Sequence, residues 1–402
     1  MFRQMVRNRA LLTFMLGHFT VDTFGGLLPV LYPLMATAFG LSLADVGWIA
    51  LCFTGASSLS QPFFGLAADR FGSRYLAPAS IVWASVMFGI VGFSPSVTIL
   101  AISAAMAGLG SGAYHPLGAS NAASVTGDMQ KNTAMSLYTF GGSSGYALGP
   151  VLGAVIFGLF GRQGSVALVP FGIVAAWLIY QSFKRFGLGL PEVRRGEQSK
   201  QPSIRWRPLA PVMGVSMLRN MVSLSVITFV PLWYRDMGYS VAFYGALTSA
   251  IIIGSAFGTV CGGLLADRFG QRRVLIIEMA LAVPALAVFM LNPGYGGFLL
   301  GPLYGFICDG PSSVTLVMAQ RLLPGRVGMA SGFVLGLSFV AAGIGAPLTG
   351  SLADRIGTPD AMMIISLLMF VAIALVAFIP REALQVREVP PPPPLLAPAI
   401  DD

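Results

Sequence analysis

The sequence predicts an all-α membrane protein whose twelve transmembrane helices form two pseudo-symmetric six-helix bundles. Three observations predict this fold: an extreme apolar composition, twelve separable apolar segments and an internal repeat. The 402 residues are 55% hydrophobic and only 10% charged, with a mean hydropathy of +0.77. A soluble protein of this composition would carry more apolar surface than it could cover. The lipid bilayer is therefore the expected solvent.

Each crossing of the hydrocarbon core needs about 20 mostly apolar residues. In the first half we expect helices over residues 10–38, 43–67, 75–94, 97–125, 132–160 and 164–184. In the second half we expect them over residues 209–234, 241–265, 274–292, 297–321, 326–352 and 360–380. The first apolar stretch is about twice as long as the core of a signal peptide, so it should remain attached as a spanning helix.

Two polar segments divide the chain. Residues 185–208 contain Pro191, Gly196 and Pro202 among many basic residues, a composition that favours a cytoplasmic linker. Residues 381–402 include five consecutive prolines from Pro390 to Pro394, which predict a disordered polyproline tail in the cytoplasm. The expected domains are thus an N-terminal bundle over 1–184 and a C-terminal bundle over 209–380.

The basic residues predict orientation. The net charge of +8 sits in short clusters between apolar runs, which indicates membrane topology and excludes a nucleic-acid-binding face. Almost all Lys and Arg residues outside the helices fall on one side, with Arg162, Arg235 and Arg355 as the exceptions. Because positive residues resist translocation, we expect both termini in the cytoplasm of a multi-pass protein in the cytoplasmic (inner) membrane.

The halves repeat each other. The ten residues from Gly65 to Arg74 match those from Gly263 to Arg272 at eight positions, at a constant offset of 198. The same offset aligns Pro33 with Pro231. Parallel repeats of six helices predict a binding cavity between the halves.

These residues resemble the major facilitator superfamily of secondary transporters, over nearly the whole chain. The repeated segment resembles the family's loop between helices 2 and 3, where glycines allow close approach and Asp and Arg hold one gate shut. An Asp beside two Arg residues at a helix end can also exchange ion-pair partners between two states; the alternative is a tight solvated turn. The residues expected to gate are Gly65, Asp69, Arg70, Gly72, Arg74, Gly263, Asp267, Arg268, Gly270 and Arg272.

A second motif lies in the fifth predicted helix. The stretch around Gly145, Gly149, Pro150 and Gly153 resembles the family's antiporter motif, which implies exchange rather than uniport. Such glycines also allow simple helix packing. One departure from the family is that the helix 4 motif, an Arg four residues ahead of Gly108, fails because Ala104 occupies that place. Proton transfer should therefore use other groups.

Ionisable side chains inside a bilayer are costly and usually functional. Near the midplane the sequence has five of them: His18, Asp22, His115, Arg219 and Asp309. They fall on helices 1, 4, 7 and 10, which line the central cavity of the family resembled. We therefore expect all five around one cavity that binds substrate and protons.

Each of these residues suits a role. His18 and Asp22 are four residues apart and share a helix face, so they could share a transported proton; a purely structural pair is the alternative. His115 precedes a helix-bending proline and could bind substrate or a proton. Arg219 stays charged and suits an anionic substrate or Asp309. Glu278 should be structural, within reach of Arg272 and Arg273.

A narrower resemblance is to the fosmidomycin resistance subfamily of drug efflux proteins. It is carried by the runs 17–22 (GHFTVD), 114–116 (YHP) and 319–332 (AQRLLPGRVGMASG). Relatives place Glu and Arg shortly after the His-Pro pair, whereas this chain has Leu117 to Asn121, a departure that removes charged groups near the cavity. The resemblance implies proton-coupled export of a small drug or metabolite, such as an anionic phosphonate.

Other readings stay open. The same fold supports a proton-coupled importer of a sugar, organic acid or metabolite, and a non-transporting membrane sensor is a further alternative. The cysteines match no metal or disulfide spacing. No nucleophile and base pair, metal cluster or nucleotide loop indicates an enzyme. We expect no cofactor or metal, the proton gradient as energy source, and a monomer whose partners are substrate, protons and lipid.

Overall fold

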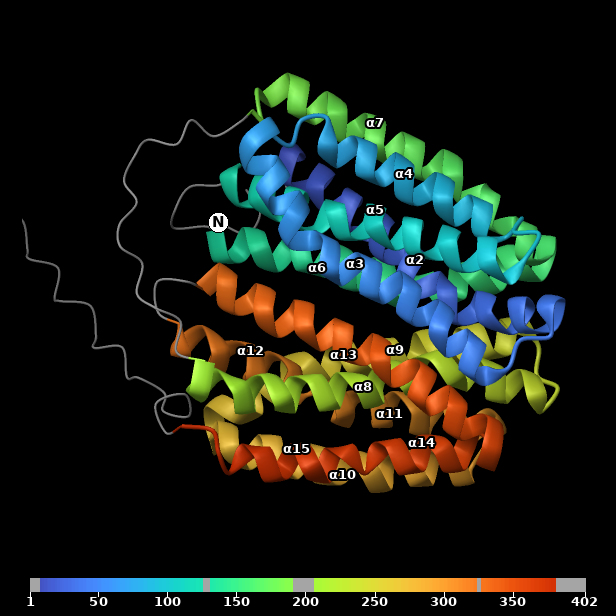
Figure 1. Ribbon diagram of the computed structural model, residues 1–402. Helices are drawn as coiled ribbons and strands as arrows, with labels where there is room; N and C mark the ends of the chain where they lie inside the picture. Colours follow the sequence, from blue (N-terminus) through green and yellow to red (C-terminus); the bar gives the residue numbers. More distant parts are fainter. Residues whose placement is uncertain (1–7, 126–130, 191–205, 324–326, 381–402) are drawn as a thin grey trace, which may run out of the picture.

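The computed structural model describes residues 8–125, 131–190, 206–323 and 327–380, all of it helical or in short connections (Figure 1). The first half contains α2 (Arg9–Phe39), α3 (Leu43–Phe71), α4 (Leu76–Val91), α5 (Val97–Ser124), α6 (Lys131–Phe160) and α7 (Leu168–Phe186). Residues 191–205 of the expected linker and 381–402 of the expected tail lie outside the described residues.

The second half contains α8 (Trp206–Asp236), α9 (Val241–Phe269), α10 (Gln271–Leu291), α11 (Gly297–Asp309), α12 (Pro311–Leu322), α13 (Val327–Ile356), α14 (Thr358–Ser366) and α15 (Leu368–Val376). Nine stretches of the described chain are long and apolar enough to cross a membrane, one of which, Leu137–Phe186, contains both α6 and α7. Helix α4 is a shorter apolar helix.

Two expected helices are interrupted. The tenth breaks at Gly310 into α11 and α12, and the twelfth breaks at Leu367 into α14 and α15. Pro311 explains the first break, because proline lacks the N–H that would continue the helical hydrogen bonding. The sixth begins later than expected, at Leu168, because the 3₁₀ segment η2 (Gly161–Ala167) precedes it.

Helix boundaries follow from local chemistry. Helix α3 begins at a capping box in which the Ser42 hydroxyl accepts from the Asp45 N–H and Asp45 accepts from the Ser42 N–H. Helix α9 begins 198 residues later with Ser240 as its N-cap. Both helices have 29 residues and end at a glycine with positive φ, Gly72 at 78° and Gly270 at 91°. The repeat read from the sequence is thus also a repeat of backbone structure.

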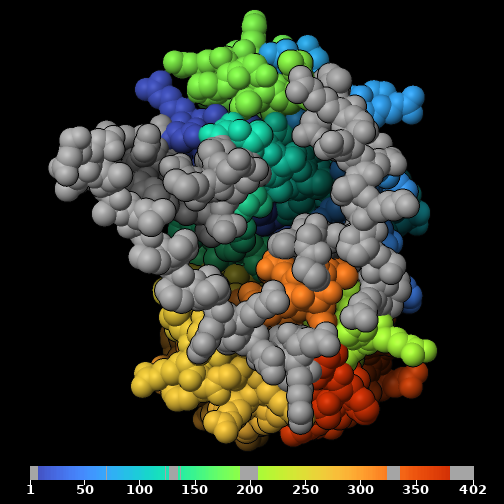
Figure 2. All heavy atoms as spheres, turned by 90° about the vertical axis from the view of Figure 1, so that its left-hand side faces the viewer, coloured from blue at the N-terminus to red at the C-terminus, as the bar shows by residue number. Residues whose placement is uncertain are grey.

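The two halves meet face to face along two helix pairs, α3 with α13 and α6 with α9. We name the side of the molecule where α2 begins and α7 ends the linker side, and the opposite side the far side. Viewed from the linker side, the first half lies above the second (Figure 2). Glycines bring the halves together, since Gly47 of α3 lies against the backbone of Ala346 and Pro347, with no room for a Cβ.

Several hydrogen bonds between described residues join the halves toward the far side. Asp354 at the end of α13 accepts from the start of α3, and Arg235 at the end of α8 donates to the Pro33 carbonyl at 3.1 Å. Nearer the middle, Ser249 of α9 bonds to α6. These contacts close the seam on the far side.

Candidate functional site

The first polar cluster joins His18, Asp22 and His115, from α2 and α5. His18 Nε2 lies 3.2 Å from Asp22 Oδ2, and His115 Nε2 lies 3.5 Å from Asp22 Oδ1. The two imidazole rings meet edge to face with centroids 5.1 Å apart. One carboxylate therefore contacts two imidazoles, the arrangement needed to pass a proton among three groups.

Helix α6 supports this cluster through Tyr138. The ring of Tyr138 stacks on His18 at 4.2 Å, its carbonyl oxygen lies 2.9 Å from His18 Nδ1, and its hydroxyl donates to the His115 carbonyl at 3.2 Å. Because a carbonyl can only accept, His18 Nδ1 must carry a hydrogen. His18 Nε2 is then the ring atom directed at Asp22.

A glycine makes room for the cluster. A Cβ at Gly142 of α6 would overlap Asp22 Oδ2 and His18 Nε2. Helix α2 packs against α5, α6 and α7 of its own half and against α8 across the seam. The side chains of Asp22 and His115 are nevertheless 23% and 24% exposed, so the surrounding helices do not enclose them completely.

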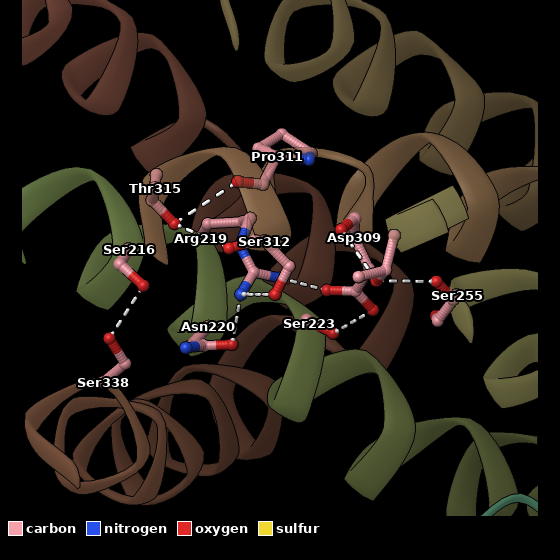
Figure 3. Close-up of polar contacts among 11 residues, drawn as sticks. Ser216, Arg219, Asn220, Ser223, Ser255, Asp309, Pro311, Ser312, Thr315 and Ser338 are labelled. Carbon is pink, nitrogen blue, oxygen red and sulfur yellow. Dashed lines mark hydrogen bonds and ion pairs between the residues drawn. The ribbon is translucent and has the colours of Figure 1, made fainter. Parts of the chain in front are cut away.

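The second cluster is an ion pair between Arg219 of α8 and Asp309 at the end of α11 (Figure 3). Arg219 also donates to Asn220 Oδ1 at 2.7 Å and to Ser312 Oγ at 3.1 Å, while Ser223 donates to Asp309 Oδ2 at 3.0 Å. The Arg219 side chain is only 3% exposed. Its buried Nε has no hydrogen-bond partner within the described structure.

Asp309 sits at the α11–α12 break. The hydroxyl of Thr259 donates to the backbone carbonyl of Asp309 at 3.1 Å, which satisfies one of the carbonyl groups freed by the break. On the other face, Glu278 of α10 packs against Gly310, where a Cβ would lie 2.6 Å from both carboxylate oxygens. Glu278 Oε2 lies buried without a hydrogen-bond partner among the described residues, and that Glu278 is structural stays a prediction.

The two clusters occupy equivalent places in the repeats. The offset of 198 carries His18 to Ser216 and Asp22 to Asn220, and Asn220 is a partner of Arg219. The five ionisable residues thus fall into a set of three in the first half and a pair in the second, rather than one continuous network.

The three side chains of the first cluster could also bind a metal ion. The donor atoms of His18, Asp22 and His115 lie within 4.8 Å of one another, and two imidazoles with one carboxylate suit several transition metals. The expectation of no metal stays a prediction.

The motif expected to gate ends α3 and α9 at Gly72 and Gly270, whose φ is positive, and two of its arginines lie against neighbouring aromatic rings. Arg70 lies over the ring of Phe71 at 5.2 Å, and Arg268 lies over Phe269 at 5.3 Å. The Arg74 guanidinium donates to the Phe183 carbonyl in α7 at 3.4 Å, and its backbone N–H donates to the Gly189 carbonyl just beyond α7. The side chain of Asp69 lies outside the part that the structure describes.

The antiporter motif lies where α6 packs between the two halves. Gly145 and Gly149 face α2, where a Cβ would overlap the Phe19 carbonyl and approach the Gly26 backbone. The opposite face meets α9, since the carbonyl of Pro150 would lie 2.8 Å from a Cβ on Gly245. The motif therefore allows α6 to touch its own half and the partner half at once.

Sequence reasoning missed Asp354. Residues 350–357 repeat the pattern Gly-x-x-Ala-Asp-Arg-x-Gly of residues 65–72 and 263–270, and this third copy was the signal that could have found it. Asp354 makes the hydrogen bonds between the halves that lie at the far end of α13.

Two repeated helical halves, each with a cluster of ionisable side chains in its membrane-spanning part, are typical of a secondary transporter. The chain belongs to the Major Facilitator Superfamily, whose family profile matches residues 14–333 and 211–400. This is a family of membrane transporters and not of enzymes.

Particular relatives are similar along most of their length. The uncharacterized MFS-type transporter YfnC of Bacillus subtilis (strain 168) is 28% identical over 372 residues, which cover 87% of this chain and 88% of that protein. The fosmidomycin resistance protein of Escherichia coli (strain K12) is 28% identical over 348 residues, 85% of each chain. The crystal structure of a bacterial homolog of the human lysosomal transporter Spinster superposes with a TM-score of 0.78 at 16% identity, over 94% of this chain and 98% of that one.

Proposed function

We propose that this transporter is a proton-coupled antiporter that exports a small anionic drug or metabolite of the phosphonate type by alternating access. The observation that carries the proposal is the division of the buried charge into two clusters. The first offers three groups that can exchange protons, and the second offers a guanidinium that can exchange one carboxylate for another anion.

The contact between His18 and Asp22 supports a proton site. With a hydrogen on His18 Nδ1, the 3.2 Å contact of Nε2 with Asp22 Oδ2 needs a further proton on one of these two atoms, because two lone pairs would otherwise face each other. The cluster in this geometry therefore corresponds to a proton-loaded state. Releasing the proton would break the contact and free Asp22 to rearrange.

The Arg219 cluster supports an anionic substrate. A planar guanidinium binds phosphonate or carboxylate oxygens through paired hydrogen bonds. Asp309 occupies that position, and the buried Arg219 Nε, which has no partner among the described residues, is a further donor that a bound anion would engage. An incoming anion could replace Asp309, which Ser223 would continue to hold.

The relatives support drug export. The fosmidomycin resistance protein is similar over 85% of both chains, and a multidrug resistance protein of Proteus mirabilis (strain HI4320) is 23% identical over 290 residues. Because the basic residues gather on the linker side, we propose that the linker and both termini lie in the cytoplasm. We also propose that the protein is a monomer in the cytoplasmic membrane.

Everted membrane vesicles from a transporter-deficient host provide the test. With an acidic interior, addition of fosmidomycin should release protons from vesicles that contain this chain, and the drug should accumulate inside. Collapsing the pH gradient with an ionophore should abolish accumulation. A parallel arm with a metal chelator separates proton coupling from coupling to a divalent cation.

The outcomes distinguish the alternatives. Uptake into right-side-out vesicles together with protons would replace export by import. Absence of flux for a panel of anionic and neutral toxic compounds, with the protein correctly inserted, would favour a sensor. Accumulation that survives loss of the pH gradient and responds to the chelator would overturn proton coupling.

A further inference from the structure

The end of α13 closes with the same turn as the ends of α3 and α9. Gly357 has φ 91° and donates to the Ala353 carbonyl at 2.8 Å, as Gly72 does to Ala68 and Gly270 to Ala266. All three copies of the Gly-x-x-Ala-Asp-Arg-x-Gly pattern thus end a helix by the same turn. The first two copies end α3 and α9 on the linker side, and the third ends α13 on the far side.

In the third copy the aspartate reaches the other half of the molecule. Asp354 Oδ1 accepts from the Leu43 N–H at 2.8 Å, and Oδ2 accepts from the Ala44 N–H at 3.0 Å. These are the first two backbone donors of α3, which have no partner inside their own helix. A carboxylate at a helix N-terminus is further stabilised by the helix dipole.

Helix α3 does not need this carboxylate in order to begin. Ser42 and Asp45 already form a complete local capping box, so the bonds from Asp354 add a connection between the halves rather than a start signal. The surrounding backbones are also close, because Gly350 of α13 lies against the Leu43 carbonyl with no room for a Cβ.

The equivalent place in the first half has no such group. The end of α6 aligns with the end of α13 in the repeat, and the offset of 198 carries Asp354 to Ile156. The α6–α9 seam can therefore form no matching carboxylate contact. The carboxylate contact is present at the α3–α13 seam and has no counterpart at the α6–α9 seam, so a single substitution of Asp354 should remove it.

We infer that Asp354 is the latch that holds the two halves together on the far side, and that it must release α3 before the transporter opens to that side. The inference rests on the alternating access of the family and on no assumption about substrate or proton. Arg235, bound to the Pro33 carbonyl, lies on the same side and would also help to hold the two halves together.

The test measures opening of the seam directly. A reporter cysteine replaces Thr54, which is half-buried in α3 next to Gly343 of α13, in a chain whose three native cysteines are replaced. A membrane-impermeant thiol reagent is applied from the far side. In Asp354→Asn the labelling rate should rise about tenfold, the effect of losing one charge-assisted hydrogen bond.

The matched control is Asp360→Asn, an exposed aspartate in the first turn of α14 on the same side; its labelling rate should equal that of the parent. A second variant, Ala44→Pro, removes one donor from the opposite partner and suits the first turn of a helix; it should raise labelling in the same direction. Unchanged rates in both Asp354→Asn and Ala44→Pro would overturn the latch. Since labelling needs no substrate, this result is independent of the proposed antiport.

Discussion

Asp22 and Arg219, one from each cluster, are proposed to exchange different partners: Asp22 exchanges protons and Arg219 exchanges anions. Asp22 is the only member of its cluster that contacts both histidines, so it is the group through which a proton would pass from one ring to the other. Arg219 is the only member of its cluster that contacts Asp309, Asn220 and Ser312 together. Substitutions at these two positions should therefore have different effects.

Asp22→Asn should abolish flux driven by a pH gradient while leaving substrate exchange at equal pH. Asparagine keeps the shape of the side chain but cannot take up and release a proton. Vesicle uptake with and without a gradient measures the first effect, and exchange of labelled for unlabelled substrate measures the second. Asp360→Asn serves as control, and gradient-driven flux at the parental rate in Asp22→Asn would remove Asp22 from the proton path.

Arg219→Ala should weaken transport of anionic substrates much more than that of neutral ones, because it removes the fixed positive charge. It should also destabilise the protein by about 3–5 kcal/mol, since Asp309 is left buried without its partner. The double variant Arg219→Ala/Asp309→Asn should recover most of the thermal stability in detergent without recovering anion transport. Equal loss for anionic and neutral substrates in the double variant would contradict the role of Arg219.

At the scale of helices, glycines decide how closely the clusters are packed. Gly142→Ala should stop transport, because the added methyl would overlap Asp22 and His18. Gly158→Ala on the same helix is the matched control, since nothing lies within 4 Å of its Cβ position. Both variants should insert normally, and transport assays at equal membrane content compare them. Parental activity in Gly142→Ala would show that the cluster can accommodate a methyl group beside Asp22 and His18.

The α11–α12 break offers a second test among helices. Gly310→Ala places a methyl 2.6 Å from both carboxylate oxygens of Glu278, so overpacking should cost about 1–3 kcal/mol and displace the neighbouring Asp309. Adding Glu278→Ala makes room and should restore thermal stability. Without such rescue, the cost of Gly310→Ala would have to come from the backbone and not from Glu278.

At the scale of the whole molecule, the closed far side can be locked covalently. A Cβ on Gly343 would lie 3.6 Å from the Thr54 Cβ across the α3–α13 seam, within the range of a disulfide. Thr54→Cys/Gly343→Cys in a chain free of native cysteines should crosslink on mild oxidation and lose transport. Reductant should restore it, and neither single cysteine variant should respond. Full transport by the crosslinked protein would mean that the halves need not separate here.

Periodicity and composition predicted most of the helices within a few residues, because a bilayer demands long apolar segments whatever their partners. The break at Gly310 was missed even though Gly310-Pro311 stands in the sequence, since a proline in a membrane helix can be tolerated or can end it, depending on neighbours. The packing of Glu278 against Gly310 is such a neighbour effect.

By itself the sequence determined the membrane class, the duplication and the identity of the buried ionisable residues, because these depend on composition and on spacing along the chain. Only the tertiary structure decided that His115 joins His18 and Asp22, that Asp309 joins Arg219, and that Asp354 crosses to α3. Each of these contacts joins residues about 90 or more positions apart, and helix packing, not local pattern, brings such residues together.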